Sequence, residues 1–190
     1  MATPAEGFSR LLAVLDQMEI PYYVGGSVAS SAHGIPRTTM DLDLVADLSP
    51  DQVNEFASLL HPDFYADAGM MREALARGRS FNLIHYASAY KFDVFPPRQD
   101  EYSRQEFARR KFTEIRSLGP EPIECAVATA EDTVLRKLEW YRAGGETSER
   151  QWNDLRGVLK VSGAQLDREY MYEWARYLKI DDLLDRLLAE

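Results

Sequence analysis

The sequence contains very little cysteine and no long apolar run. Cys125 is the only cysteine in 190 residues, which excludes an internal disulfide and a zinc cluster built from cysteines. No segment approaches the roughly 20 apolar residues that a membrane-spanning helix needs. The N-terminal segment also lacks the basic and then apolar order of a signal peptide. We therefore expect a cytoplasmic protein with no membrane contact, and we expect Cys125 to be a core residue.

Basic charge is also scarce, because 22 Lys and Arg residues face 31 Asp and Glu residues, for a formal net charge of −9. Affinity for a nucleic-acid backbone comes from clustered Lys and Arg, so this balance excludes a protein whose whole surface grips such a backbone. Exposed charge ordinarily marks a solvated helix face. One local basic segment remains, formed by Arg104, Arg109, Arg110, Lys111 and Arg116.

The apolar pattern predicts a chain in two parts. In the first part, helical periodicity alternates with short runs of strand-forming residues. Helices are expected over 4–18, 28–33, 51–60 and 69–77. Strands are expected at 22–24, from 41, near 64, over 81–86 and 90–95, and twice within 112–127. The strands 81–86 and 90–95 are predicted to form an antiparallel hairpin because only a short connection separates them.

From Thr129 onward the strand-forming residues thin out and amphipathic helices replace them. These helices are expected over 130–143, 148–161, 168–178 and 181–188. The predicted fold class is therefore α+β, with a mixed sheet and flanking helices followed by a C-terminal helical bundle. We place a first domain at 1–128 and a helical region at 129–190.

The most informative stretch is YYVGGSVASSAHGIPRTTMDLDLV, from Tyr22 to Val45. Gly25 and Gly26 break the first strand, and glycines let backbone amides approach a phosphate closely. Ser27 is expected to cap the short helix that follows, and a helix N-terminus favours an anion. Asp41 and Asp43 are spaced i, i+2 in a strand, so their carboxylates project from one face. Two such oxygen donors suit Mg²⁺.

Asp93 is the candidate for a third carboxylate in the same site. It lies in the apolar strand YKFDVF, where an aspartate is costly to bury unless it binds a cation or is hydrogen-bonded. Three carboxylates would hold two metal ions, one that activates an attacking hydroxyl and one that steadies a leaving pyrophosphate. The sequence therefore predicts a site for an NTP and two Mg²⁺ ions.

At these residues the sequence resembles the DNA polymerase beta-like nucleotidyltransferase superfamily, in particular its minimal and AbiEii-like bacterial members. The resemblance covers roughly residues 20–96 and consists of the Gly-Gly turn, the Asp-x-Asp pair and a later acidic residue. It implies that Gly26 and Ser27 hold the nucleotide phosphates and that the neighbouring Gly25 also binds the nucleotide. It also implies that Asp41 and Asp43 bind both metals, and that Asp93 binds the metal nearer the attacking hydroxyl.

Further residues are carried over by the same resemblance. Arg37, Thr38 and Thr39 match the segment that commonly precedes the aspartate pair. Lys137 and Asp154 resemble a lysine and an aspartate that are often site residues on later helices of AbiEii-like relatives. One departure is the Val28 that follows Ser27, because CCA-adding relatives have an Arg-Asp pair after the glycines. A CCA-adding enzyme is therefore disfavoured.

The leading functional prediction is transfer of a nucleoside monophosphate from an NTP to a hydroxyl acceptor. The AbiEii-like resemblance implies a toxin that modifies an RNA such as tRNA and is opposed by a cognate antitoxin, and the basic segment around Arg109 favours this acceptor slightly. An alternative is a small-molecule adenylyltransferase that inactivates an antibiotic. A third reading is a non-catalytic nucleotide-binding module of the same fold, although three mutually repelling aspartates count against it.

Overall fold

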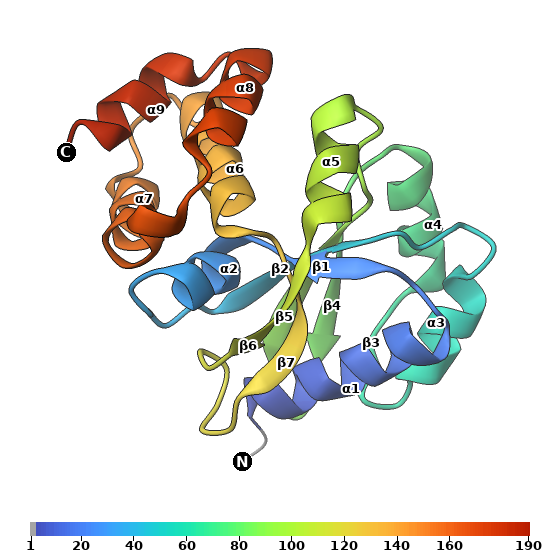
Figure 1. Ribbon diagram of the computed structural model, residues 1–190. Helices are drawn as coiled ribbons and strands as arrows, with labels where there is room; N and C mark the ends of the chain where they lie inside the picture. Colours follow the sequence, from blue (N-terminus) through green and yellow to red (C-terminus); the bar gives the residue numbers. More distant parts are fainter. Residues whose placement is uncertain (1–2) are drawn as a thin grey trace.

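The computed structural model describes residues 3–190, which form one seven-stranded mixed sheet with helices around it (Figure 1). The strand order is β3-β4-β5-β2-β1-β7-β6. Pairing is parallel between β1 and β7 and between β2 and β5, and the other neighbours are antiparallel. The strands are β1 Tyr22–Val24, β2 Asp41–Ala46, β3 Phe64–Tyr65, β4 Phe81–His85, β5 Tyr90–Phe95, β6 Lys111–Ile115 and β7 Ile123–Val127.

Helices precede, interrupt and follow these strands, so the predicted α+β class is confirmed. None of the helices in residues 3–190 combines the length and apolarity that a membrane crossing requires. Their bounds are α1 Pro4–Gln17, α2 Gly26–His33, α3 Val53–Leu60, α4 Ala68–Ala76, α5 Glu101–Arg109, α6 Ala130–Ala143, α7 Glu149–Ser162, α8 Arg168–Leu178 and α9 Asp181–Leu188, with a short 3-10 turn at Gly163–Gln165.

One face of the sheet is covered by α1, which is anchored at its start by a capping box between Thr3 and Glu6. The Phe8 ring of α1 stacks on Phe92 of β5, with ring centroids 6.2 Å apart, and both side chains are fully buried. Phe92 alternates along β5 with Asp93, so the carboxylate of Asp93 projects to the opposite face. The core under α1 therefore leaves the other face of β5 free for polar residues.

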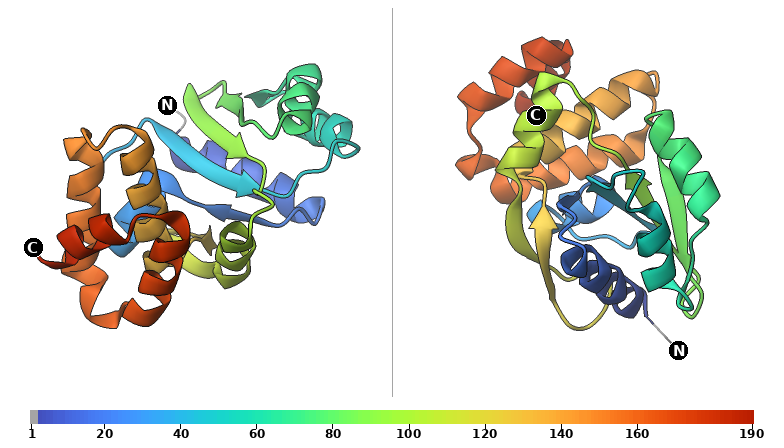
Figure 2. Two further views of the ribbon diagram at one scale, coloured as in Figure 1. Left: turned by 90° about the horizontal axis from the view of Figure 1, so that it is seen from above. Right: turned by 90° about the vertical axis from the view of Figure 1, so that its right-hand side faces the viewer.

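A second apolar core lies among the C-terminal helices α6 to α9, which gather on one side of the molecule (Figures 1 and 2). Leu135, Leu155, Met171 and Leu184 of these four helices are fully buried in it. Tyr102 of α5 belongs to the same core. Short α2 packs against both α6 and α7, which brings the helical region against the glycine turn. The division at 128 stays a prediction.

Two expectations about local structure are wrong. The short helix α2 begins at Gly26 instead of Val28, and Gly25 is its N-cap in place of Ser27. The first helical turn closes two residues earlier than expected, through the bond from Ala29 N to Gly25 O at 3.1 Å. Helix α5 was not expected at all, because it buries Tyr102 and polar Ser103 and Glu106 and shows no apolar stripe.

Candidate functional site

Strands β2 and β5 bring the three predicted aspartates to one face of the sheet. The parallel register places Asp43 directly opposite Asp93, and Asp41 opposite Lys91. Burial alternates along β2, where Leu42 is fully buried and both aspartates are partly exposed. Neighbouring strands lie about 4.8 Å apart. Asp43 and Asp93 are therefore side-by-side carboxylates on neighbouring strands.

The glycine turn lies directly against Asp43. Gly25 donates its backbone N–H to the carbonyl oxygen of Asp43 at 2.9 Å. Gly26 has a φ of +55°, which an L side chain rarely adopts. A Cβ atom at Gly26 would overlap the carboxylate of Asp43. Both the backbone conformation and the close approach thus require glycine at position 26. Helix α2 therefore begins beside the aspartates.

Arg37 connects the first turn of α2 to the helical region. Its guanidinium donates to the Ser27 hydroxyl and, in a bidentate arrangement, to Asp154 at 2.7 and 2.9 Å. Asp154 also accepts a hydrogen bond from Lys137 Nζ at 2.8 Å. The side chains of Lys137 and Asp154 are only 9% and 7% exposed. Four residues predicted to bind nucleotide therefore form one continuous network from α2 to α6 and α7.

The ionisation of this network follows from its contacts. Burial alone would raise the pKa of Asp154, but hydrogen bonds from Arg37 and Lys137 outweigh it and lower the pKa. Burial lowers the pKa of Lys137, and the bond to Asp154 opposes that shift. The hydrogen bonds that Arg37 itself donates to Asp154 raise the pKa of Arg37. Two cations and one carboxylate leave the network with a net positive charge at the N-terminus of α2.

The carboxylate of Asp43 is in a less favourable environment. Burial raises its pKa first, and the neighbouring Asp41 and Asp93 raise it further. Lys137 and Lys91 oppose the shift through their positive charges. Two of the predicted site residues, Asp43 in the sheet and Lys137 in the helical region, thus interact electrostatically, and the Lys137 charge favours the ionised form of Asp43.

Thr39 lies against Asp41. Its hydroxyl donates toward Asp41 Oδ1 at 3.0 Å and toward the Asp41 carbonyl oxygen at 3.1 Å. The hydroxyl of Tyr90 donates to the same carbonyl oxygen at 2.9 Å. These contacts give Thr39 an orienting role toward a carboxylate, and its predicted contact with nucleotide stays a prediction.

Lys91 was missed by the sequence reasoning. Its Nζ lies 2.8 Å from Asp93 Oδ2 and 3.9 Å from Asp41 Oδ2. The hydrogen bond to Asp93 is the main cause of a raised Lys91 pKa. The signal was available, because Lys91 precedes Asp93 by two residues in a strand and so shares its face.

The donor set fits a hard divalent cation, although the side chains do not form a ready-made site. In residues 3–190, no three acidic, histidine or cysteine side chains are arranged as a metal-holding group. Asp41, Asp43 and Asp93 nevertheless share one face and offer the oxygen ligands that Mg²⁺ prefers. The ammonium of Lys91 already stands at two of them as a cation. A metal ion would be held by these three carboxylates.

Two arginines of the basic segment that favoured an RNA acceptor, Arg109 and Arg110, form contacts within the protein. The Arg109 guanidinium lies 3.4 Å from Asp132 Oδ2 and 3.5 Å from Glu131 Oε2, and it stacks on the Tyr170 ring at 3.8 Å. Arg110 donates to the carbonyl oxygen of Phe107 at 2.6 Å. Arg109 therefore links α5 to α6 and α8, so its charge is largely neutralised where it lies.

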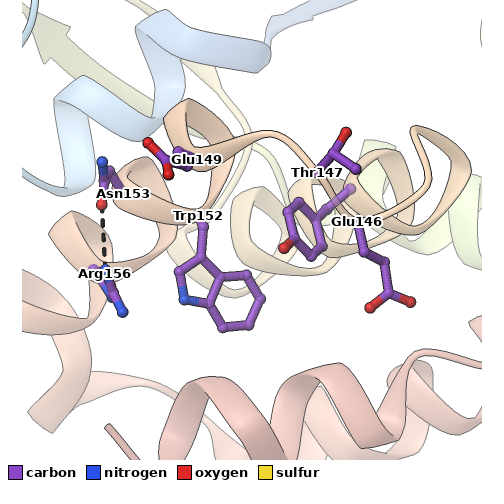
Figure 3. Close-up of a pocket in the computed structure, with 7 residues that line it drawn as sticks. Glu146, Thr147, Glu149, Trp152, Asn153 and Arg156 are labelled. Carbon is purple, nitrogen blue, oxygen red and sulfur yellow. Dashed lines mark hydrogen bonds between the residues drawn. The ribbon is translucent and has the colours of Figure 1, made fainter.

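A separate pocket of about 470 Å³ lies in the helical region (Figure 3). Trp152, which lines this pocket, contacts two residues at the end of the chain. The Arg186 guanidinium stacks on Trp152 at 4.2 Å, and Trp152 Nε1 donates to Glu190 at 3.0 Å. The lining contains none of the predicted site residues, so the candidate site is the aspartate face. The pocket is lined by Tyr141, Glu146, Thr147, Glu149, Trp152, Asn153 and Arg156.

No protein-family model matches the sequence, and no curated protein matches it. Several solved structures have a similar fold, among them the following three. The solution structure of the antibiotic-resistance factor ANT(2'')-Ia has a TM-score of 0.54 at 12% identity, covering 95% of this chain and 96% of that one. The crystal structure of ANT(2'')-Ia in complex with adenylyl-2''-tobramycin has a TM-score of 0.52 at 15% identity, covering 90% and 94%.

The third similar structure is an antigenic nucleotidyltransferase-like protein from Paracoccidioides brasiliensis. It has a TM-score of 0.53 at 16% identity and covers 97% of this chain and 92% of that one. At these identities the likeness concerns the fold. The chain has a nucleotidyltransferase fold over nearly its whole length, so the predicted fold is confirmed, while the AbiEii-like resemblance stays a prediction.

Proposed function

We propose that the protein transfers a nucleoside monophosphate from an NTP to a hydroxyl acceptor. The observation that carries this proposal is the in-register pair Asp43 and Asp93, with Asp41 on the same face and Gly26 packed against Asp43. Holding three carboxylates side by side on a partly buried face is unfavourable unless a cation neutralises them. Two Mg²⁺ ions at this face would supply charge neutralisation and a more nucleophilic acceptor oxygen.

The chain's own residues have separable roles in this proposal. The amides at the α2 N-terminus and the Ser27 hydroxyl bind the phosphates, because a helix N-terminus favours anions. Arg37 and Lys137 supply positive charge on the same side, and Asp154 holds both cations in place. Thr39 orients Asp41.

The reaction forms one bond and breaks one bond. The acceptor oxygen attacks the α-phosphorus, and the bond from the α-phosphorus to the oxygen that leads to the β-phosphate breaks as pyrophosphate leaves. The hydroxyl proton passes to a carboxylate on the acceptor side, for which we propose Asp93. Most of the catalytic effect would come from positioning and charge stabilisation, as in other phosphoryl transfers.

For the acceptor we favour a small molecule over an RNA. The net charge is −9, and Arg109 is held by Asp132 and Glu131 and is not available to bind a phosphate backbone. A protein of similar fold, ANT(2'')-Ia, is described as an antibiotic-resistance factor and was crystallised with adenylyl-2''-tobramycin. An aminoglycoside-like polyhydroxylated cation would also be attracted to a negatively charged protein.

The AbiEii-like toxin is the second candidate. The bonded pair Lys137 and Asp154 supports it, because the resemblance implied a lysine and an aspartate on later helices as site residues. In this hypothesis the acceptor is tRNA and the protein partner is a cognate antitoxin.

The test supplies the purified protein with Mg²⁺ and each of four α-labelled NTPs, together with a panel of aminoglycosides and lincosamides or total tRNA. Label in a small molecule supports the first reading, and label in RNA supports the second. Binding is followed separately by melting temperature, since ligand at 100 times its dissociation constant adds about 2.7 kcal/mol to the free energy of unfolding. A melting shift without transfer would indicate the non-catalytic nucleotide-binding module, and neither transfer nor a shift with any NTP at millimolar concentration would contradict the proposed function.

A further inference from the structure

Lys91 forms ion pairs with two of the three aspartates. It lies two residues before Asp93 on β5 and opposite Asp41 on β2. Its Nζ is 2.8 Å from Asp93 Oδ2 and 3.9 Å from Asp41 Oδ2. The ammonium thus stands between the carboxylates of two different strands.

This position conflicts with a metal ion bound by the same oxygens. An oxygen ligand of Mg²⁺ lies about 2.1 Å from the ion, so an ammonium bonded to that oxygen would lie within a few ångströms of a divalent charge. Like charges at such a distance repel strongly where water is partly excluded. The Asp93 side chain is only 15% exposed, while that of Lys91 is 40% exposed. Lys91 therefore has room to move toward solvent, and Asp93 does not.

We propose that Lys91 is an internal counter-ion that competes with the divalent cation for Asp41 and Asp93. The inference rests on the proposed function, since it assumes a metal at these aspartates. A metal ion alone must break the Lys91–Asp93 ion pair without compensation. A metal–nucleotide complex brings phosphate oxygens that accept the displaced ammonium. Metal and nucleotide accordingly enter together, and the site stays metal-poor when no nucleotide is present.

The experiment measures Mn²⁺ binding by the paramagnetic resonance signal of free Mn²⁺, with and without a non-hydrolysable NTP analogue. Lys91→Met removes the competing charge, and Lys91→Gln is a second neutral variant that keeps a donor for Asp93. Lys91→Arg preserves the charge. Lys111→Met is the matched control, because Lys111 is an exposed lysine on β6. Circular dichroism verifies the fold of each variant.

Without nucleotide, Lys91→Met and Lys91→Gln are expected to bind Mn²⁺ at least about tenfold more tightly than the wild type, because a repelling unit charge a few ångströms away is lost. The gain in Mn²⁺ affinity caused by nucleotide should shrink in the same variants. Metal-free Lys91→Met should melt at a lower temperature than the wild type and recover when Mn²⁺ is added. Lys91→Arg and Lys111→Met should behave like the wild type.

Two results would overturn the inference in different ways. If the wild type binds Mn²⁺ and nucleotide but Lys91→Met and Lys91→Gln show unchanged Mn²⁺ affinity, Lys91 is only a structural ion-pair partner and the proposed function stands. If no form of the protein binds Mn²⁺ with or without nucleotide, the metal site itself is wrong and the inference fails with it.

Discussion

The carboxylate of Asp43 fills the space that a side chain on Gly26 would need. A Cβ atom at Gly26 would overlap Asp43 Oδ2, and the φ of +55° at this glycine is itself unfavourable for other residues. The turn and the aspartate strand are therefore fitted to each other, and a change in either is expected to displace the other.

Gly26→Ala is predicted to lose both stability and nucleotide transfer. The positive φ costs about 1 kcal/mol for alanine, and the overlap with Asp43 adds about 1–3 kcal/mol. Gly78→Ala is the matched control, because Gly78 has a φ of +61° and its Cβ would meet no atom within 4 Å. Urea unfolding of the two variants separates the two costs. Equal destabilisation would show that the approach to Asp43 is unimportant.

Asp43→Asn is predicted to be more stable than the wild type at pH 7 and nearly inactive. Burial and the charges of Asp41 and Asp93 raise the Asp43 pKa. The native state therefore binds a proton at the Asp43 carboxylate more tightly than the unfolded chain does. The ionised carboxylate therefore opposes folding, and the gain from asparagine should disappear as pH falls below about 3.9. Activity should fall at least about 100-fold, since bound metal contributes several kcal/mol to transition-state stabilisation.

The measurements are the melting temperature across pH 3–8 in metal-free buffer, and label transfer at pH 7. Asp47→Asn, at an exposed aspartate just beyond β2, is the control and should change neither. Retention of wild-type transfer by Asp43→Asn would remove Asp43 from the site.

Asp154→Asn is predicted to lose about 3 kcal/mol of stability at pH 7, because it leaves Lys137 buried without a charged partner. The pKa of Asp154 is lowered in the fold. Its stabilising contribution is therefore complete above the ordinary aspartate pKa and is lost as pH falls through the lowered value. Asp154→Asn should thus differ least from the wild type in strong acid.

The double variant Asp154→Asn with Lys137→Met should recover part of this loss, since it removes the unpaired charge. Glu114→Gln is the surface control, because its ion pair with Arg116 is largely exposed and should contribute less than about 1 kcal/mol. Urea titrations complete the double-mutant cycle. Additive losses in the double variant would contradict the proposed coupling of Lys137 and Asp154.

Arg109→Ala is predicted to lose about 1–2 kcal/mol of stability without any effect on tRNA affinity. The loss follows from its ion pairs with Glu131 and Asp132 and its stacking on Tyr170. Salt titrations of tRNA binding provide the measurement, with Lys111→Ala for comparison. A weaker affinity, with a logarithmic salt slope reduced by roughly one unit, would return RNA to first place among the acceptors.

Local sequence patterns determined much of the fold. The i, i+2 spacing of Asp41 and Asp43 was enough to place both on one face, because strand side chains alternate regardless of what surrounds the strand. The four C-terminal helices also follow from periodicity, since each buries an apolar stripe. Apolar periodicity does not predict helix α5, because the buried side chains of this helix include the polar Ser103 and Glu106. Its N-cap, Asp100, is nevertheless a residue type that commonly begins a helix.

Only the tertiary structure decided which distant groups meet. Arg37 and Asp154 are 117 residues apart in the chain, and their contact depends on how α7 packs against α2. Lys91 faces Asp41 because β2 and β5 pair in parallel in one register, which the intervening residues do not encode locally. Such contacts are fixed by burial of the whole core. A shift of one residue in strand pairing would turn the aspartates toward the core and leave the same local sequence without a site.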